Sequence, residues 1–261
     1  MRVWVLPVAL LALAGCVSHA PPRREPGHPI LPAALPAGLP TGQPTGAPAG
    51  RPVPAGRDVD CGLLKCVALT FDDGPSRHTG GLLDLLRQRA VRATFFVVGE
   101  MVAADRHGET VRRIAADGHE LGNHSWSHLS LTGLPRRAVK RQLTHTEHLV
   151  RQLTGVRMQV MRPPYGSTDA RVAAETRREG LAQILWNVDT FDWRDHEPAK
   201  VAARAAHARP GSIILMHDIH RSTVKAVPAV LDRLAAKGFT FVTVSELYGN
   251  GPVPGRTYGA R

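Results

Sequence analysis

The chain is short of lysine, of cysteine and of long apolar runs. Only five of its 33 basic residues are lysine, and its arginines are spread along the chain, so the net charge of +11 does not indicate a nucleic-acid-binding face. A glycine-rich phosphate loop of the Walker or dinucleotide type is also absent. With 43% hydrophobic and 21% charged residues, disorder throughout the chain is excluded.

The N-terminal apolar run covers positions 3–13. It is too short to span a bilayer, which takes about 20 apolar residues, and is typical of a signal peptide. The tetrapeptide Leu13-Ala14-Gly15-Cys16 is similar to a bacterial lipobox, in which the cysteine is lipidated and becomes the new N-terminus. We therefore predict a lipoprotein-type signal peptide over residues 1–16. Cleavage near Ala14 to a free secreted protein and an uncleaved anchor are the alternatives, and in each case the chain is exported.

Export changes the interpretation of the other two cysteines, Cys61 and Cys66. Disulfides persist outside the cytoplasm, so this pair predicts a disulfide that closes a tight loop at the start of the folded domain. Zinc binding by the pair is the weaker alternative, because no second cysteine pair exists to complete four ligands. Residues 17–57 are rich in Pro, Ala and Gly and predict a disordered, semi-extended tether.

From Lys65 onward, β-rich runs alternate with amphipathic stretches, which predicts parallel βα units. The expected strands are 66–71, 93–98, 119–122, 158–162, 183–188, 212–216 and 239–244. The expected helices are 80–90, 110–117, 136–153, 169–179, 198–208 and 223–237. About seven strands in roughly 190 residues favour a slightly incomplete (β/α) barrel, with an open doubly wound sheet as the alternative.

Polar side chains collect where these strands end, at the edge where a parallel barrel builds its active site. Taken singly, each group has an ordinary explanation as a turn, a helix cap or a chance surface spacing. Their joint occurrence on one face is the argument for function. The groups are Asp72-Asp73-Gly74-Pro75, His124 and His128, Arg162-Pro163-Pro164-Tyr165-Gly166, Asp189 with Asp192-Trp193, and His217-Asp218.

These residue types suit a metal-dependent hydrolase. The i, i+4 spacing of His124 and His128 places them on one side of a helical turn, where two imidazoles can share one ion. One carboxylate with two imidazoles makes a three-ligand site with an open position for water, as in catalytic metal sites. A second carboxylate then serves as general base and a separate histidine protonates the leaving group. A nearby arginine would lower the pKa of the base, and a carboxylate would keep the acid histidine protonated.

Together these segments resemble the polysaccharide deacetylase family, the NodB-homology domain of carbohydrate esterase family 4, over residues 65–247. The motifs are intact and in order: Thr70-Phe-Asp-Asp-Gly-Pro75, His124-Ser-x-x-His128, Arg162-Pro-Pro-Tyr-Gly166, Asp189-x-x-Asp-Trp193 and Leu215-x-His217. The resemblance implies a distorted, incomplete (β/α)7–8 barrel that removes N- or O-acetyl groups from sugar polymers. It also implies Zn²⁺ or another divalent metal such as Co²⁺, Mn²⁺ or Ni²⁺.

The resemblance assigns a role to each motif residue. Asp72 is the general base, His217 the general acid, and Asp73, His124 and His128 the metal ligands. Arg162 orients Asp72, Asp189 tunes His217, and the backbone N–H of Tyr165 helps to hold the oxyanion. The acetyl pocket is lined by Trp193, Leu215 and Pro163.

Four further residues lie outside these assignments. His145 and His148 are expected to be solvated on a helix. His220 is interpreted as a surface residue, with a position facing the substrate as the alternative. Trp126 is either a packing residue or a platform for sugar stacking.

We expect a catalytic domain over residues 58–250, followed by a flexible tail over 251–261. The predicted activity is metal-dependent N-deacetylation of amino-sugar polymers by a monomer that binds no nucleic acid. Peptidoglycan is the expected substrate, because an enzyme anchored by lipid to the outer face of the cytoplasmic membrane meets that polymer first. Chitooligosaccharide deacetylation, acetylxylan O-esterase activity and a catalytically idle carbohydrate-binding protein are the alternatives. A phosphatase of the aspartyl-nucleophile kind would want its two aspartates separated by one residue, whereas here they are adjacent.

Overall fold

Buried strands alternate with helices along the chain in this computed structural model, which describes residues 59–249 and 251–261. The predicted signal peptide with Cys16 and the predicted tether over 17–57 lie outside the described residues. Strand β1 (Cys66–Asp72) is buried at all seven positions, as expected for a parallel strand covered on both faces. Among the described residues, no helix is long and apolar enough to cross a membrane.

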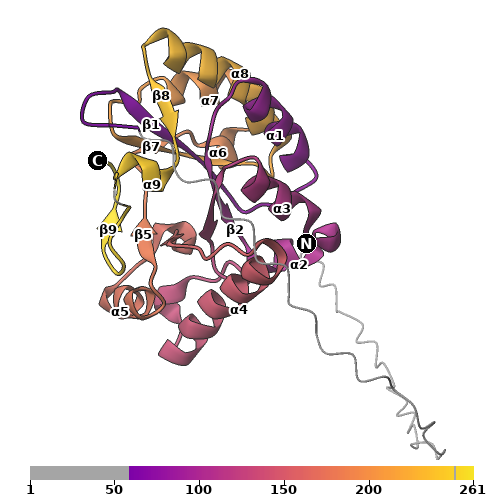
Figure 1. The fold of residues 1–261 in the computed structure, drawn as a ribbon, viewed down its shortest axis with the longest axis vertical. Coiled ribbons are helices and arrows are strands. Elements are labelled where there is room, and N and C mark those ends of the chain that lie inside the picture. The colour runs from indigo at the N-terminus through magenta and orange to yellow at the C-terminus, as the bar shows by residue number, and fades with distance from the viewer. Residues whose placement is uncertain (1–58, 250) are drawn as a thin grey trace, which may run out of the picture. The chain divides into compact units, whose positions relative to one another are not determined.

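The strands form one curled sheet in which all ladder pairings are parallel. In spatial order they are β6 (Val188–Asp189), β7 (Ser212–His217), β1, β2 (Thr94–Val97), β3 (Glu120–Asn123), β4 (Val160–Met161), β5 (Ala182–Ile184) and β9 (Thr257–Tyr258). Strand β8 (Thr240–Val242) pairs with the first half of β1, whereas β2 pairs with its second half. This arrangement is the predicted incomplete barrel (Figure 1).

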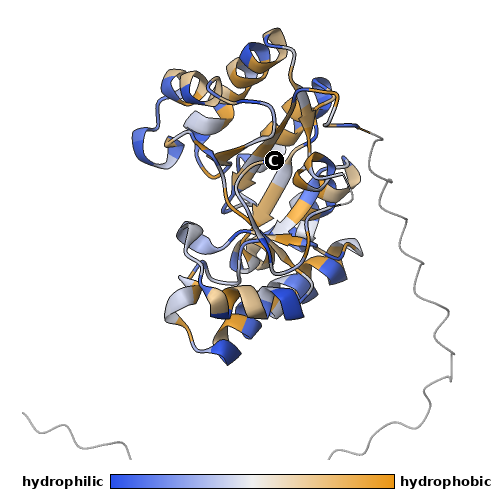
Figure 2. Cartoon of the chain, turned by 90° about the vertical axis from the view of Figure 1, so that its left-hand side faces the viewer, coloured by the Kyte–Doolittle hydropathy of each residue, from blue (hydrophilic) through white to orange (hydrophobic). Residues whose placement is uncertain are grey.

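The helices fall between the strands and cover the outside of the sheet (Figure 1). They are α1 (Thr79–Gln88), α2 (Gly99–Ala104), α3 (Glu109–Ala116), α4 (Arg136–Thr154), α5 (Ala170–Arg178), α6 (Asp192–Asp195), α7 (Pro198–Ala205), α8 (Arg221–Ala236) and α9 (Val244–Leu247). In Figure 2 the strands are mostly hydrophobic, while the helices carry both apolar and polar residues. Each longer helix therefore buries one stripe and exposes the other.

Alternation along β1 creates two hydrophobic cores. Val67, Leu69 and Phe71 pack with the apolar faces of the helices, whereas Cys66 and Ala68 belong to a second core inside the curled sheet. Because side chains of a strand alternate between its faces, Thr70 and Asp72 continue the inward series. The last inward position of β1 is thus a carboxylate at the rim of the barrel.

Helix ends follow local sequence signals. Helix α4 begins after Pro135 and ends at Gly155, whose φ of 75° is the left-handed conformation that glycine adopts readily. At the start of α5, the Asp169 carboxylate accepts a hydrogen bond from the Val172 N–H at 2.8 Å. These signals made the long helices predictable to within a few residues.

Two predicted segments differ from the structure. The expected strand 183–188 is two strands, β5 and β6, because the chain changes its pairing partner within this segment. The Leu185 N–H donates to the Tyr258 carbonyl of β9, whereas the Asn187 N–H donates to the Ile213 carbonyl of β7. The segment 251–261, predicted as a flexible tail, instead contributes β9, which pairs with β5. Its last residues pair with the start of β7, since Arg261 N–H bonds the Gly211 carbonyl and Ala260 bridges Ser212. The C-terminus thereby links two strands that are not neighbours in the sheet.

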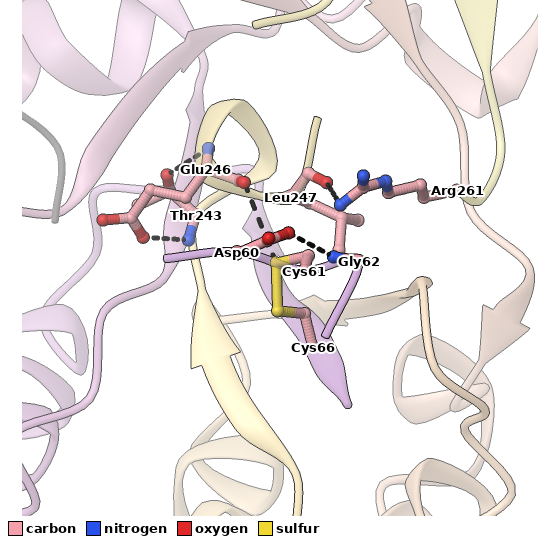
Figure 3. The surroundings of a disulfide bond; sticks show 8 residues. All are labelled: Asp60, Cys61, Gly62, Cys66, Thr243, Glu246, Leu247 and Arg261. Carbon is pink, nitrogen blue, oxygen red and sulfur yellow. Dashed lines mark hydrogen bonds between the residues drawn. A yellow bond between two sulfur atoms is a disulfide. The ribbon is translucent and has the colours of Figure 1, made fainter. Parts of the chain in front are cut away.

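Cys61 and Cys66 form the disulfide that their spacing predicts, with an S–S distance of 2.06 Å. The loop lies against α9, where the Glu246 carbonyl is 3.9 Å from Cys61 Sγ (Figure 3). The Asp60 carboxylate accepts the Gly62 N–H at 2.7 Å and shapes the turn. Because both sulfur atoms are in the bond, the alternative of zinc binding by this pair is excluded.

Candidate active site

The strand register brings the predicted base and acid together. Asp72, the last residue of β1, is in register with His217, the last residue of β7. Both residues therefore lie at the carboxyl edge of the sheet, where parallel strands deliver functional side chains. The contact spans 145 positions of sequence and depends entirely on the sheet.

Arg162 anchors one oxygen of Asp72. This arginine has 0% exposed surface, and its Nη1 donates to Asp72 Oδ1 at 2.7 Å and to Thr70 Oγ1 at 2.7 Å. Its other nitrogens donate to the Ile184 and Leu185 carbonyls at 3.0 and 3.1 Å. Burial lowers the pKa of Arg162, and the Asp72 carboxylate opposes that effect. A buried charge whose three nitrogens each donate to an acceptor is tolerable, and it fixes the orientation of Asp72.

Asp73, His124 and His128 form a cluster with metal-binding geometry. Each offers one donor atom, and the three atoms lie within 4.8 Å of one another. Asp73 Oδ1 is 3.4 Å from His124 Nε2 and 3.2 Å from His128 Nε2. Donors of a tetrahedral zinc site with bonds near 2.0–2.1 Å are about 3.3 Å apart. Asp73 Oδ1 is also buried without a hydrogen-bond partner among the described residues, so the cluster fits a divalent ion.

The two histidines converge by a different route from the predicted one. Residues 124–128 form no helical turn; they lie in a loop in which Ser125 has φ 65° and His128 φ 54°. Two side-chain hydrogen bonds within the segment fix the shape of this loop. Asn123 Oδ1 accepts the Ser125 N–H at 2.9 Å, and Ser125 Oγ accepts the His128 N–H at 3.1 Å. The i, i+4 spacing identified the right pair, but the helical explanation was wrong.

Contacts outside the cluster orient its imidazoles. His124 Nδ1 lies 2.7 Å from the Arg162 carbonyl oxygen, so this nitrogen is the protonated one and Nε2 is left free to bind an ion. The His128 ring packs edge-on against the Tyr165 ring, with centroids 4.7 Å apart. Arg162 therefore orients two residues of the site: its side chain binds Asp72, and its backbone carbonyl binds His124 Nδ1.

The electrostatics favour the ligand forms of Asp73 and His128. Burial raises the pKa of Asp73, but the close approach of the His124 and His128 imidazoles outweighs it and lowers the pKa to about 2. Burial and the neighbouring His124 lower the pKa of His128. An ionised carboxylate and neutral imidazoles are the forms that bind a metal ion.

His217 is paired with Asp192 and not with Asp189, so the predicted role of Asp189 is wrong. His217 Nδ1 lies 2.9 Å from Asp192 Oδ1, and the His217 N–H donates to Asp192 Oδ2 at 2.7 Å. Thr223 Oγ1 donates to the same Oδ2 at 2.7 Å. Burial lowers the pKa of His217, but the hydrogen bond and charge of Asp192 outweigh it and raise the pKa to about 9. His217 is thus protonated at neutral pH.

Asp189 lies elsewhere because of the turn that follows it. Its Oδ1 accepts the Phe191 N–H at 2.7 Å, and Phe191 adopts φ 50°, which turns the chain so that Asp192 returns to His217. Asp189 itself lines a separate cavity of about 440 Å³ with Phe191, Arg204 and other residues beside β6. Both aspartates were in the motif, and the left-handed residue between them decided which one reaches the histidine.

The residues predicted to line the acetyl pocket lie around this centre. Leu215 is buried in register with Thr70 of β1, and Pro163, directly after Arg162, is also buried. Trp193 follows Asp192 and is 48% exposed, and Tyr165 is 71% exposed. A buried floor with exposed aromatic rings beside it is a surface suited to a sugar.

Backbone strain is concentrated at this edge of the sheet. Among the described residues, all but two of the non-glycine residues with left-handed φ lie in the segments that follow β1, β3, β4 and β6: Asp73, Ser125, His128, Tyr165, Phe191 and His196. The other two are Ala90 and His107. Strained residues persist only where their surroundings hold them, and they gather at functional sites.

The four residues outside the motif assignments can be placed. Trp126 packs edge-on against His145 at 5.7 Å, and a side chain at Gly99 would collide with the Trp126 ring, so Trp126 is a packing residue. His145 and His148 are exposed on α4, as predicted. His220 is partly buried, with its ring 6.1 Å from that of His217 and 4.6 Å from that of His196.

Comparison with known proteins agrees with this geometry. Residues 61–184 match the family model described as polysaccharide deacetylase. A chitin deacetylase of Colletotrichum lindemuthianum is 37% identical over 77% of this chain and 87% of its own length. The chain belongs to the polysaccharide deacetylase family. The solved structure "T48 deacetylase with substrate" is 42% identical, with a TM-score of 0.73 over 77% of this chain and 99% of its own.

A bacterial relative is similar over less of its length. The peptidoglycan-N-acetylglucosamine deacetylase PgdA of Listeria monocytogenes is 42% identical over 74% of this chain but only 41% of its own length. The chain therefore spans less than half of that relative.

Proposed function

We propose that this polysaccharide deacetylase family member is a metal-dependent N-deacetylase of amino-sugar polymers, with peptidoglycan as its substrate. The observation that carries the proposal is the joint geometry of the site. Asp72, oriented by Arg162, has its Oδ2 3.7 Å from His124 Nε2 of the Asp73, His124 and His128 cluster, and His217, whose pKa is raised, is the register partner of Asp72 on the neighbouring strand. A binding protein has no use for a base and an acid placed at a metal site.

In this proposal Asp73, His124 and His128 hold the ion, which is Zn²⁺ or another divalent metal. When bound, the ion acidifies a water molecule and polarises the acetyl carbonyl. Asp72 accepts the proton of the attacking water at Oδ2, because Oδ1 is occupied by Arg162. The backbone N–H of Tyr165 donates to the acyl oxygen as negative charge develops there.

His217 completes the hydrolysis. Its Nδ1 is held by Asp192, so Nε2 is the atom that donates a proton to the leaving amide nitrogen. The C–N bond breaks, and the products are acetate and a free amino sugar. Asp192 keeps His217 protonated until that step, and Trp193, Leu215 and Pro163 form the walls that orient the acetyl group.

The choice of peptidoglycan rests on the relatives and on the predicted export of the chain. The Listeria relative and a Bacillus subtilis relative, PdaC, are named as peptidoglycan deacetylases, whereas other relatives are named as chitin or chitooligosaccharide deacetylases. We propose that the chain is an exported lipoprotein attached through Cys16 to the outer face of the cytoplasmic membrane, where it acts as a monomer. That attachment places it beside the wall polymer.

Acetate release by the purified protein tests the proposal. Peptidoglycan, N-acetylglucosamine oligomers and acetylated xylan are supplied with chelator and after Zn²⁺ is restored. Release from peptidoglycan that chelator abolishes and zinc restores is the expected result. Release from acetylated xylan alone would replace the proposal with an O-esterase, and no release at one bound zinc per chain would leave a carbohydrate-binding protein.

A further inference from the structure

Asp218, which directly follows His217, has no role in the proposed chemistry, yet its carboxyl group is completely buried at the edge of the site. Its Oδ2 accepts a hydrogen bond from Thr79 Oγ1 at the start of α1. Its Oδ1 has no hydrogen-bond partner among the described residues. A buried carboxyl oxygen without a partner is costly, so a compensating function is expected.

The Asp218 carboxyl lies against Gly74, the residue after the metal ligand Asp73. A Cβ added to Gly74 would be 2.5 Å from Asp218 Oδ1 and 2.6 Å from Oδ2. Gly74 is not among the residues with positive φ, so its backbone conformation is one that alanine also adopts. The requirement for glycine at this position therefore comes from the Asp218 carboxyl and not from the backbone.

Other bonds hold the same turn from both sides. Ser76 Oγ donates to the Asp218 carbonyl at 2.9 Å, and the Ser76 N–H donates to Thr79 Oγ1 at 2.8 Å. From the opposite side, the Val98 N–H at the end of β2 donates to the Gly74 carbonyl at 3.0 Å. The turn is thus clamped between the ends of β7 and β2.

Asp73 needs such a clamp. Its φ of 72° lies in the left-handed region, which costs free energy for any residue with a Cβ. Its Oδ1 must nevertheless stay 3.4 and 3.2 Å from the two imidazoles. If the turn relaxed, Asp73 would adopt a φ of lower energy, and its carboxylate would move away from the two imidazoles.

We infer that Asp218 is a positioning residue: its carboxyl, held by Thr79, packs on Gly74 and keeps the Asp73 turn in the strained shape that binds the metal ion. The inference rests on the proposed function for the identity of the ion site. It concerns the shape of the carboxyl group and its contact with Gly74, and it extends the site to a residue outside the reacting groups.

Affinity for Zn²⁺, measured by competition with a chromophoric chelator, tests the contact without any substrate. Gly74→Ala is expected to weaken zinc binding about 10–100-fold, because the added methyl displaces the turn. Gly80→Ala is the matched control, since a Cβ there meets nothing within 4 Å, and it should bind zinc as the wild type does. The melting temperature of each metal-free variant reports whether the fold is intact.

The double variant gives the decisive comparison. Asp218→Ala alone is expected to weaken zinc binding about tenfold and to lower kcat with KM unchanged. In the Asp218→Ala background the methyl of Gly74→Ala has room, so Gly74→Ala should cost little further affinity. Equal losses from Gly74→Ala in the two backgrounds would overturn the inference.

Asp218→Asn separates shape from charge. The amide keeps the size of the carboxyl and an oxygen that accepts from Thr79, so zinc affinity within about threefold of the wild type is expected. A loss as large as that of Asp218→Ala would show an effect of charge and contradict the inference. Because the readout is metal affinity, a wild-type protein that binds zinc but releases no acetate would defeat the proposed function and leave this result standing.

Discussion

The two ends of the barrel both bury polar groups, but they do so in opposite ways. At the amino end Glu120 is surrounded by donors: Thr94 Oγ1 at 2.9 Å, Ser245 N–H at 3.1 Å and Ser245 Oγ at 2.5 Å. At the carboxyl end Asp73 and Asp218 each keep a buried oxygen that has no hydrogen-bond partner in the described part of the chain, and Asp73 has a strained backbone. The contrast holds for the carboxylates, since His119 Nε2 beside Glu120 is also buried without a partner among the described residues. The carboxylates that combine an unpartnered oxygen with a strained turn lie where the ion is proposed to bind.

The largest effect is expected from removing a metal ligand at the carboxyl end. His124→Ala should lose both tight zinc binding and acetate release, because it removes a donor at 3.4 Å from Asp73 Oδ1. Bound zinc per chain and acetate release are the measurements. His148→Ala, which changes an exposed histidine on α4 whose side chain contacts the Thr144 carbonyl of the same helix, is the control and should change neither. Stoichiometric, tight zinc in His124→Ala would contradict the ligand assignment.

Removing the base should separate turnover from metal binding. Asp72→Asn keeps an oxygen for Arg162 but cannot accept the proton of water, so kcat should fall about 10²–10⁴-fold while zinc remains bound. Steady-state kinetics on the zinc-loaded variant check this. The exposed Asp232→Asn is the matched control. An active Asp72→Asn would show that another group accepts the proton.

The pH profile should distinguish the two aspartates of the fourth motif. Because the pKa of His217 is raised to about 9, the acid form is present at neutral pH and activity should decline as pH rises through about 9. Asp192→Asn removes the group that raises this pKa and leaves the burial that lowers it. The alkaline limb should therefore move to lower pH by about 1–3 units.

Asp189→Asn provides the comparison for that shift. Asp189 accepts the Phe191 N–H and, among the described residues, forms no hydrogen bond with His217, so its variant should keep the wild-type alkaline limb. The kcat/KM profile from neutral to alkaline pH is measured for both variants. If the alkaline limb moved in Asp189→Asn and not in Asp192→Asn, Asp189 and not Asp192 would be the residue that raises the pKa of His217.

The smallest effect on activity is expected at the amino end. Glu120→Ala leaves the donors of buried Thr94 and partly buried Ser245 without an acceptor, so the free energy of unfolding should fall by about 2–4 kcal/mol. Its kcat at 25 °C should stay at the wild-type value, and Glu120→Gln should lose less stability. Urea unfolding measures the stability of both variants, and steady-state kinetics measure their kcat. A fall in kcat without a fall in stability would contradict the assignment of Glu120 to the fold and not to the active site.

Much of the fold and the site could be predicted because the relevant signals are local. Alternating strands and helices predicted the barrel, and the Asp72-Asp73 pair, the two histidines of the loop and Arg162 were recognisable at the strand ends. Parallel strands carry their ends to one edge, so position along a strand is enough to place such residues at the site. The cysteine spacing likewise predicted the disulfide.

The sequence alone therefore determined the family, the architecture and the residue types of the centre. Tertiary structure decided which aspartate reaches His217, how 251–261 joins β5 to β7, and why Gly74 faces Asp218. The physical reason is that these contacts join residues 25 to 144 positions apart through single left-handed residues and short pairings. Periodicity and spacing report on neighbours along the chain, whereas such contacts exist only after the sheet has curled.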